Sequence, residues 1–88
     1  MPPIRVYSTT HCGYCVRAKM LLEKLGLAFE EIDVTGNDDA RKWLVSVTGG
    51  RKTVPQIFIG DAAIGGWQEL CALQRSGQLA EMLNMETA

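Results

Sequence analysis

Two cysteines separated by two residues, Cys12 and Cys15, stand where a strand-like run gives way to a helix-like one. Ile4–Ser8 alternates apolar and polar residues as a short strand does, and a helix is expected over about Gly13–Leu25. Phe29–Val34 then predicts a second strand. A strand, a helix and a strand within about thirty residues imply a parallel, right-handed unit. The cysteines are therefore expected at the C-terminal end of the first strand, where open α/β sheets place their sites.

The helix that carries the cysteines has one apolar face. Its apolar residues recur at spacings of three and four, which is typical of a helix packed on a core. They are Ala18, Leu21, Leu22 and Leu25. Arg17, Glu23 and Lys24 are expected to point away from the core, and Gly26 is the expected stop.

The position of each cysteine on this helix predicts its chemistry. Cys12 is expected at or just before the first turn, among unpaired backbone N–H groups and the positive end of the helix dipole. Both features favour the thiolate, which is the nucleophilic form. Cys15 is expected inside the helix and closer to the core, which makes it the better resolving thiol. The pair predicts a dithiol redox site.

The rest of the chain continues the alternation of helices and strands. Thr35–Asp39 is a turn rich in helix-capping residues. The further elements predicted are a helix over Asp38–Val47, strands over Gln56–Ile59 and Ala62–Ile64 joined by a Gly60-Asp61 turn, a helix that opens at Gly65-Gly66 and runs through Gln74, and a short helix from Gly77 to about Leu83. The predicted order is βαβαββα with a helical tail, in one α/β domain over residues 1–88.

Composition excludes several other classes of protein. The net charge of −1 gives no field that would attract nucleic acid or an anionic membrane surface. No apolar stretch approaches the roughly 20 residues that span a bilayer. The three cysteines are too few for a disulfide scaffold, and Met1–Arg5 shows no signal-peptide pattern. We therefore expect a reducing setting, either the cytoplasm or, if a transit peptide has been removed, an organelle.

Three separated blocks of sequence carry a resemblance to a known family. They are Cys12-Gly13-Tyr14-Cys15, Thr53–Ile59 with the sequence TVPQIFI, and Ile64-Gly65-Gly66 before a helix. In order and spacing the chain resembles the glutaredoxins, a branch of the thioredoxin-like fold. The resemblance implies a four-stranded mixed sheet flanked by helices. It also implies a glutathione-dependent thiol–disulfide oxidoreductase that reduces protein–glutathione mixed disulfides and protein disulfides, with Cys12 as nucleophile and Cys15 as resolving thiol.

The same resemblance implies how glutathione binds. A cis peptide bond before Pro55 would hold the backbone N–H and C=O of Val54 beside Cys12, where an extended thiol peptide can pair with them like one more strand. The Gly65-Gly66 turn would offer the amides of Trp67 and Gln68 to the γ-glutamyl carboxylate.

Further residues complete the implied glutathione site. Tyr14, Thr53 and Gly66 are expected to line the cleft. Arg41 or Lys42 is expected to meet the glycine carboxylate, and we favour Arg41.

Four positions depart from the family's usual pattern. Gly13 stands where a proline is usual, and Thr9 stands where many members carry a lysine that helps to bind glutathione and activate the cysteine. Trp67 and Gln68 replace the small residue and the acid that often follow the two glycines.

Three alternative functions stay open from the sequence. Family members without the proline at Gly13 can form dimers that bridge a [2Fe–2S] cluster, with Cys12 of each chain and one glutathione per chain as ligands; this chain would otherwise be a monomer. The missing lysine at Thr9 leaves room for a redoxin recharged by a thioredoxin reductase. A structural zinc site would need His11, Cys12, Cys15 and the distant Cys71.

Several conspicuous residues also have simpler explanations. His11 fits a solvated loop, Trp43 fits packing, and Cys71 fits a half-buried filler of its helix. Four cationic residues are expected near the predicted site. They either form a solvated face or bind carboxylates of the ligand. They are Arg17, Lys19, Arg51 and Lys52.

Overall fold

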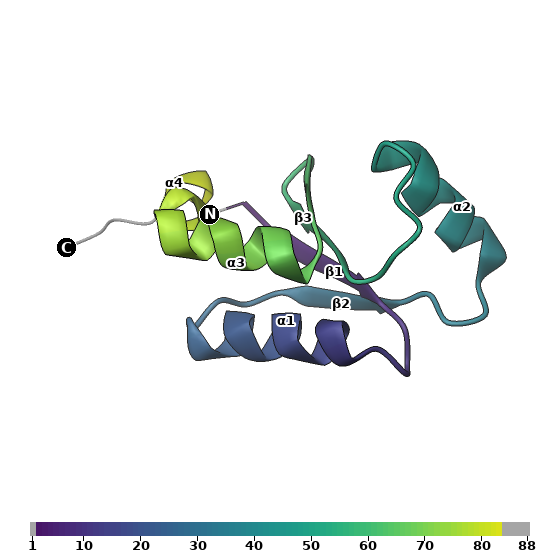
Figure 1. Cartoon of the computed structure of the whole chain (residues 1–88), viewed down its shortest axis with the longest axis horizontal. Helices are drawn as coiled ribbons and strands as arrows, with labels where there is room; N and C mark the ends of the chain where they lie inside the picture. Colours follow the sequence, from purple (N-terminus) through teal and green to yellow (C-terminus); the bar gives the residue numbers. More distant parts are fainter. Residues whose placement is uncertain (1, 84–88) are drawn as a thin grey trace.

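The computed structural model describes residues 2–83 as four strands and four helices around one sheet (Figure 1). In chain order the elements are β1 (Ile4–Ser8), α1 (Gly13–Lys24), β2 (Glu30–Asp33), α2 (Asp38–Val47), β3 (Gln56–Ile59), β4 (Ala62–Gly65), α3 (Trp67–Ser76) and α4 (Gln78–Met82). This is the predicted order, βαβαββα with a short helix at the end.

The sheet is mixed, with strand order β2-β1-β3-β4. β1 runs parallel to β2 and antiparallel to β3, so that Tyr7 lies opposite Ile32 on one side and Gln56 on the other. β4 pairs antiparallel with β3 as the predicted hairpin. The parallel β1-α1-β2 unit places the C-terminal end of β1 next to the N-terminus of α1, where the cysteines lie.

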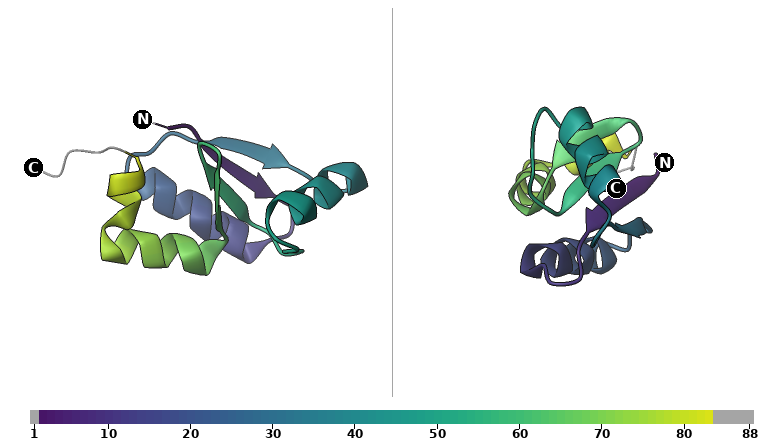
Figure 2. Two further views of the ribbon diagram at one scale, coloured as in Figure 1. Left: turned by 90° about the horizontal axis from the view of Figure 1, so that it is seen from above. Right: turned by 90° about the vertical axis from the view of Figure 1, so that its right-hand side faces the viewer.

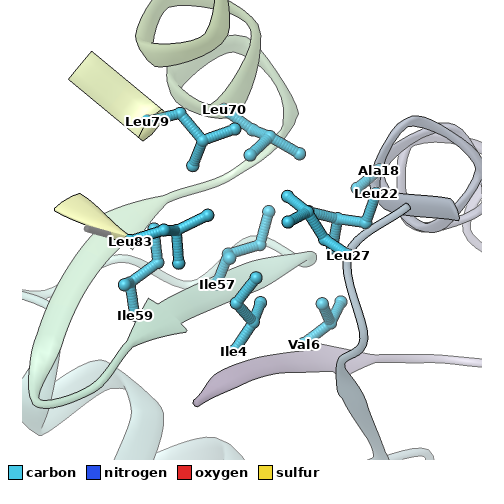
Figure 3. Close-up of a cluster of buried hydrophobic side chains, with 10 residues drawn as sticks. All are labelled: Ile4, Val6, Ala18, Leu22, Leu27, Ile57, Ile59, Leu70, Leu79 and Leu83. Atoms are coloured by element: carbon cyan, nitrogen blue, oxygen red, sulfur yellow. The ribbon is translucent and has the colours of Figure 1, made fainter. Parts of the chain in front are cut away.

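One face of the sheet carries the main core, beneath α1 and α3 (Figure 2). Figure 3 shows this cluster, to which both central strands, α1, α3 and the C-terminal segment contribute. Its buried members are Ile4, Val6, Ala18, Leu22, Leu27, Ile57, Ile59, Leu70, Leu79 and Leu83. The predicted apolar face of α1 is confirmed: Ala18 and Leu22 are fully buried, and Leu21 and Leu25 pack at the edge.

α2 packs against the other face of the sheet at one end, and Figure 1 shows it at the end of the molecule opposite α4. Tyr7, Leu44 and Phe58 form its buried cluster together with Val34. Trp43 stacks on Phe58 with ring centroids 6.0 Å apart, so the prediction that this indole serves packing is confirmed. Side chains of opposite sheet faces thus alternate along β1 and β3, as the pleat requires.

Helix ends follow the capping residues of the sequence. The side chain of Asn37 accepts a hydrogen bond from the backbone N–H of Ala40 at the start of α2, 3.0 Å away. Gly77 ends α3 with a left-handed φ of +83°. α3 begins at Trp67, later than expected, because Gly65 still belongs to β4 and Gly66 is the N-cap. Within the described residues, no helix is long and apolar enough to cross a membrane.

Candidate active site

Cys12 is the N-cap residue of α1 and forms a disulfide with Cys15. The Cα atoms of the two residues are 5.2 Å apart, and the backbone N–H of Cys15 donates to Cys12 Sγ over 3.1 Å. Cys12 is partly exposed, whereas Cys15 is 1% exposed. The predicted difference between an accessible and a shielded sulfur is therefore present in the fold.

The surroundings of Cys12 favour a negative sulfur in the reduced protein. The first turn of α1 contains no acidic residue, and the backbone N–H of Cys15 in that turn donates to Cys12 Sγ. His11 is exposed in the loop beside Cys12. A thiolate at this position would still accept the hydrogen bond from the backbone N–H of Cys15, and that bond would then be charge-assisted.

The segment before β3 lies against the reactive sulfur. The peptide bond between Val54 and Pro55 is cis, as the resemblance implies. The carbonyl oxygen of Val54 lies 3.5 Å from Cys12 Sγ, although the two residues are 42 positions apart in the chain. The predicted placement of the Val54 backbone beside Cys12 is confirmed.

A cleft of about 220 Å³ opens next to this segment and extends to the N-terminus of α3. It brings together all of the predicted ligand-binding residues except Arg41, and two further charged residues. The lining residues are Tyr14, Arg51, Thr53, Val54, Pro55, Gly66, Trp67, Gln68 and Glu69. Tyr14 is 54% exposed and holds its ring 5.5 Å from the Arg17 guanidinium.

Arg41 points to a different partner. Its Nη2 donates to the carbonyl oxygen of Lys52 over 3.1 Å, and Arg41 is not among the residues that line the cleft. Lys42 is exposed on α2. A role for either cation in binding a carboxylate stays a prediction.

Comparison with known proteins agrees with the sheet order and the cysteine geometry. The Glutaredoxin sequence profile matches residues 4–64. The chain belongs to the glutaredoxin family. A glutaredoxin from Pseudomonas aeruginosa is 44% identical over 84 residues, which cover 96% of this chain and 99% of that one.

Two solved glutaredoxin structures have the same fold. A buckwheat glutaredoxin–glutathione complex superposes with a TM-score of 0.87 at 37% identity, covering 94% of this chain and 77% of that chain. The glutaredoxin of Brucella melitensis superposes with a TM-score of 0.84 at 38% identity, covering 100% and 95%. The fold is thioredoxin-like, and the chain is a thiol oxidoreductase whose redox-active disulfide is Cys12–Cys15.

The structure adds an ion pair to this glutaredoxin's cleft that the sequence did not single out. One oxygen of Glu69, Oε1, accepts from the backbone N–H of Gly66 over 2.8 Å and from Arg51 Nη1 over 2.6 Å. The Gly66 N–H, followed by the Arg51 guanidinium, holds the pKa of Glu69 below its ordinary value. Arg51 is thereby held at the edge of the cleft.

Both glycines before α3 have close neighbours in the direction in which a Cβ would point. A Cβ on Gly66 would lie 3.1 Å from the carbonyl oxygen of Pro55, so the helix start could not approach the Val54–Pro55 segment as closely. Gly65 has a φ of +109°, and a Cβ there would meet Glu69 Oε1 at 2.5 Å. Gly66 therefore lets the start of α3 lie close to the Val54–Pro55 segment, and Gly65 leaves room for the Glu69 carboxylate.

The zinc alternative receives no support from the geometry. Within residues 2–83, no group of three or more His, Cys, Asp and Glu side chains is placed to hold a metal ion.

Cys71 is a free, half-buried cysteine on α3. Two of the four cations predicted near the site form ion pairs. Lys19 pairs with Glu31 at 2.6 Å, and Arg51 pairs with Glu69.

Proposed function

We propose that this glutaredoxin uses glutathione as its reductant and reduces protein–glutathione mixed disulfides and protein disulfides. The observation that carries the proposal is the cleft that begins at Val54, 3.5 Å from Cys12 Sγ, and ends at the N-terminus of α3. A short peptide with a thiol near its middle and a carboxylate at its end fits this arrangement. The buckwheat relative, which is 37% identical, has been solved as a glutathione complex.

Each part of the cleft has a chemical task in this proposal. The backbone of Val54 pairs with the cysteinyl residue of glutathione as an added strand would. The amides of Trp67 and Gln68 receive the γ-glutamyl carboxylate at the positive end of the α3 dipole. Arg51 also lines the cleft, where Glu69 balances its charge and leaves its remaining N–H donors for the ligand. These contacts orient the glutathione sulfur toward Cys12, and orientation is a large part of catalysis in an exchange reaction.

Deglutathionylation then needs only Cys12. Its thiolate attacks the glutathione sulfur of the mixed disulfide, a Cys12–glutathione disulfide forms, and the substrate leaves as a thiolate that takes up a proton. The thiolate of a second glutathione attacks the glutathione sulfur on Cys12. Oxidised glutathione leaves, and the Cys12 thiolate is restored.

Protein disulfides need both cysteines. Cys12 attacks one sulfur of the substrate disulfide and forms a mixed disulfide with the substrate. Cys15, whose N–H already contacts Cys12 Sγ, attacks that sulfur and releases the reduced substrate. Two glutathione molecules then supply the two electrons that reopen the Cys12–Cys15 disulfide.

A [2Fe–2S]-bridged dimer is the alternative proposal, and one observation favours it. Among residues 2–83, no atom beyond the neighbours of Gly13 and the backbone of α1 lies within 4 Å of the position a Cβ on Gly13 would occupy, so the space beside the partly exposed Cys12 is open. Thiolate is the ligand type that iron–sulfur clusters use. Anaerobic incubation with iron, sulfide and glutathione should then give a coloured dimer, and a colourless monomer would contradict the alternative.

The experiment that tests the main proposal is turnover of a glutathionylated peptide, coupled to NADPH oxidation through glutathione reductase. We expect both the wild type and the Cys15→Ser variant to turn over. Absence of turnover in both would contradict the proposal. Recovery of activity with a thioredoxin reductase in place of glutathione would then support a reductase-linked redoxin.

A further inference from the structure

The backbone that faces the reactive sulfur is held in place by two side chains. Arg41 Nη2 donates to the carbonyl oxygen of Lys52 over 3.1 Å, and Gln56 Nε2 donates to the carbonyl oxygen of Thr53 over 2.8 Å. The next carbonyl along the chain is that of Val54, which lies 3.5 Å from Cys12 Sγ. Two successive carbonyls are thus anchored immediately before the one that meets the sulfur.

Gln56 is an unusual residue for its position. It is 1% exposed and lies opposite Tyr7 in the sheet, on the face against which α2 packs. Within residues 2–83, its Oε1 is a buried polar atom with no hydrogen-bond partner. Burying an amide is unfavourable unless it makes hydrogen bonds, so an apolar side chain would suit the packing better. The bond from Nε2 to Thr53 is what a glutamine provides at this site.

The orientation of the Gln56 amide follows from its partner. The carbonyl oxygen of Thr53 only accepts, so the Gln56 nitrogen must face it. A flipped amide would place two oxygens against each other. The anchor therefore requires a donor at position 56, which neither a leucine nor an ionised glutamate supplies.

We propose that Gln56 and Arg41 are positioning residues that hold residues 52–54 as a fixed backbone edge beside Cys12. The claim that this edge helps to bind glutathione rests on the proposed function. The claim that the edge is rigid does not. Because this strand edge is already ordered before the ligand binds, the free energy of binding does not include the entropic cost of ordering it. Arg41 then acts on the ligand through the Lys52 carbonyl and not by direct contact, in agreement with its absence from the cleft lining.

Two variants and a matched control test this inference. Gln56→Leu keeps the side chain's size and removes the donor, and Arg41→Met removes the hydrogen bond to the Lys52 carbonyl. Arg75→Met is the control, because Arg75 is an exposed arginine in the last turn of α3. The substrates are a glutathionylated peptide and the same peptide joined to γ-glutamylcysteine, which lacks the glycine carboxylate.

We expect the KM for the glutathionylated peptide to rise about two- to tenfold in each variant, as the loss of one hydrogen bond predicts. The kcat should change less, because Cys12 and Cys15 stay in place. Arg41→Met should raise KM by the same factor for both substrates. If its effect vanishes with γ-glutamylcysteine, Arg41 binds the glycine carboxylate directly and the inference for Arg41 is wrong.

A second measurement does not depend on glutathione. Backbone ¹⁵N order parameters of residues 52–54 should be about 0.85 in the wild type and fall below about 0.6 in Gln56→Leu. Arg41→Met gives the same readout should Gln56→Leu fail to fold. Unchanged order parameters in the folded variants would overturn the positioning role, even if stability drops. A wild type that is inactive with glutathione but shows the expected order parameters would overturn only the proposed function.

Discussion

Gly65→Ala is the substitution whose effect the structure predicts most sharply. Gly65 has a φ of +109°, and a Cβ built there would lie 2.5 Å from Glu69 Oε1 and 2.8 Å from Arg51 Nη1. Real Cβ atoms do not approach other atoms that closely, so the carboxylate and the guanidinium must both move. The Gly66 N–H would then lose its acceptor.

The magnitude follows from three contributions. An L-residue at positive φ is destabilised by about 1–2 kcal/mol. Loss of the hydrogen bond from Gly66 to the charged Glu69 adds about 1.5–3 kcal/mol. The exposed Arg51–Glu69 pair adds about 0.2–1 kcal/mol. We therefore expect Gly65→Ala to lower the free energy of unfolding by about 3–6 kcal/mol, a large part of the stability of a small domain.

The control for this substitution is Gly77→Ala. Gly77 has a φ of +83°, and within residues 2–83 no atom other than those of its two chain neighbours lies within 4 Å of a Cβ placed there, so only the backbone contribution of about 1–2 kcal/mol applies. Urea unfolding of the oxidised proteins measures both values. The double variant Gly65→Ala/Glu69→Ala should be no less stable than Gly65→Ala alone, because Gly65→Ala already removes the hydrogen bond and the ion pair of Glu69.

Equal destabilisation by Gly65→Ala and Gly77→Ala would refute this reasoning. Additive effects of Gly65→Ala and Glu69→Ala would refute it too, because the two residues would then be independent. Either result would mean that the Glu69 carboxylate does not occupy the space beside Gly65.

Three further predictions concern the acid, the core and the cysteines. Because the pKa of Glu69 is lowered by the Gly66 N–H and then by Arg51, its stabilising effect is present above the ordinary value of 4.5 and is lost as the pH falls through the folded-state pKa. The stability difference between wild type and Glu69→Gln should thus shrink in urea titrations between about pH 7 and pH 3. Leu22→Ala should lower the free energy of unfolding by about 2–5 kcal/mol, and Leu21→Ala by less, since Leu22 is fully buried and Leu21 is not. In the glutathione-coupled assay, Cys12→Ser should abolish turnover and Cys71→Ser should leave it unchanged.

Much of the fold could be predicted from local pattern. The spacing of Ala18 and Leu22 gave the buried face of α1, and Asn37 marked the start of α2. The element boundaries were less certain, because fraying ends are decided by single hydrogen bonds. β2 is limited to Glu30–Asp33, one residue shorter at each end than its apolar pattern predicts.

The site could be predicted only in part, because its remaining features depend on tertiary contacts. The cis bond before Pro55 came from the family resemblance and not from the residues themselves. The Arg51–Glu69 pair joins side chains 18 positions apart, and the N-cap Gly66 lacks the hydroxyl that makes a capping box visible in a sequence. Gln56 looked like a strand residue, and only the fold shows its amide beneath Thr53.

The central claim is that Cys12 is the sulfur that exchanges with glutathione. It is tested most directly by exposing the Cys15→Ser variant to oxidised glutathione and mapping the modified residue by mass spectrometry. We expect one glutathione per chain, on Cys12 and removable by reduced glutathione. Modification of Cys71 alone, or no adduct at all, would contradict it.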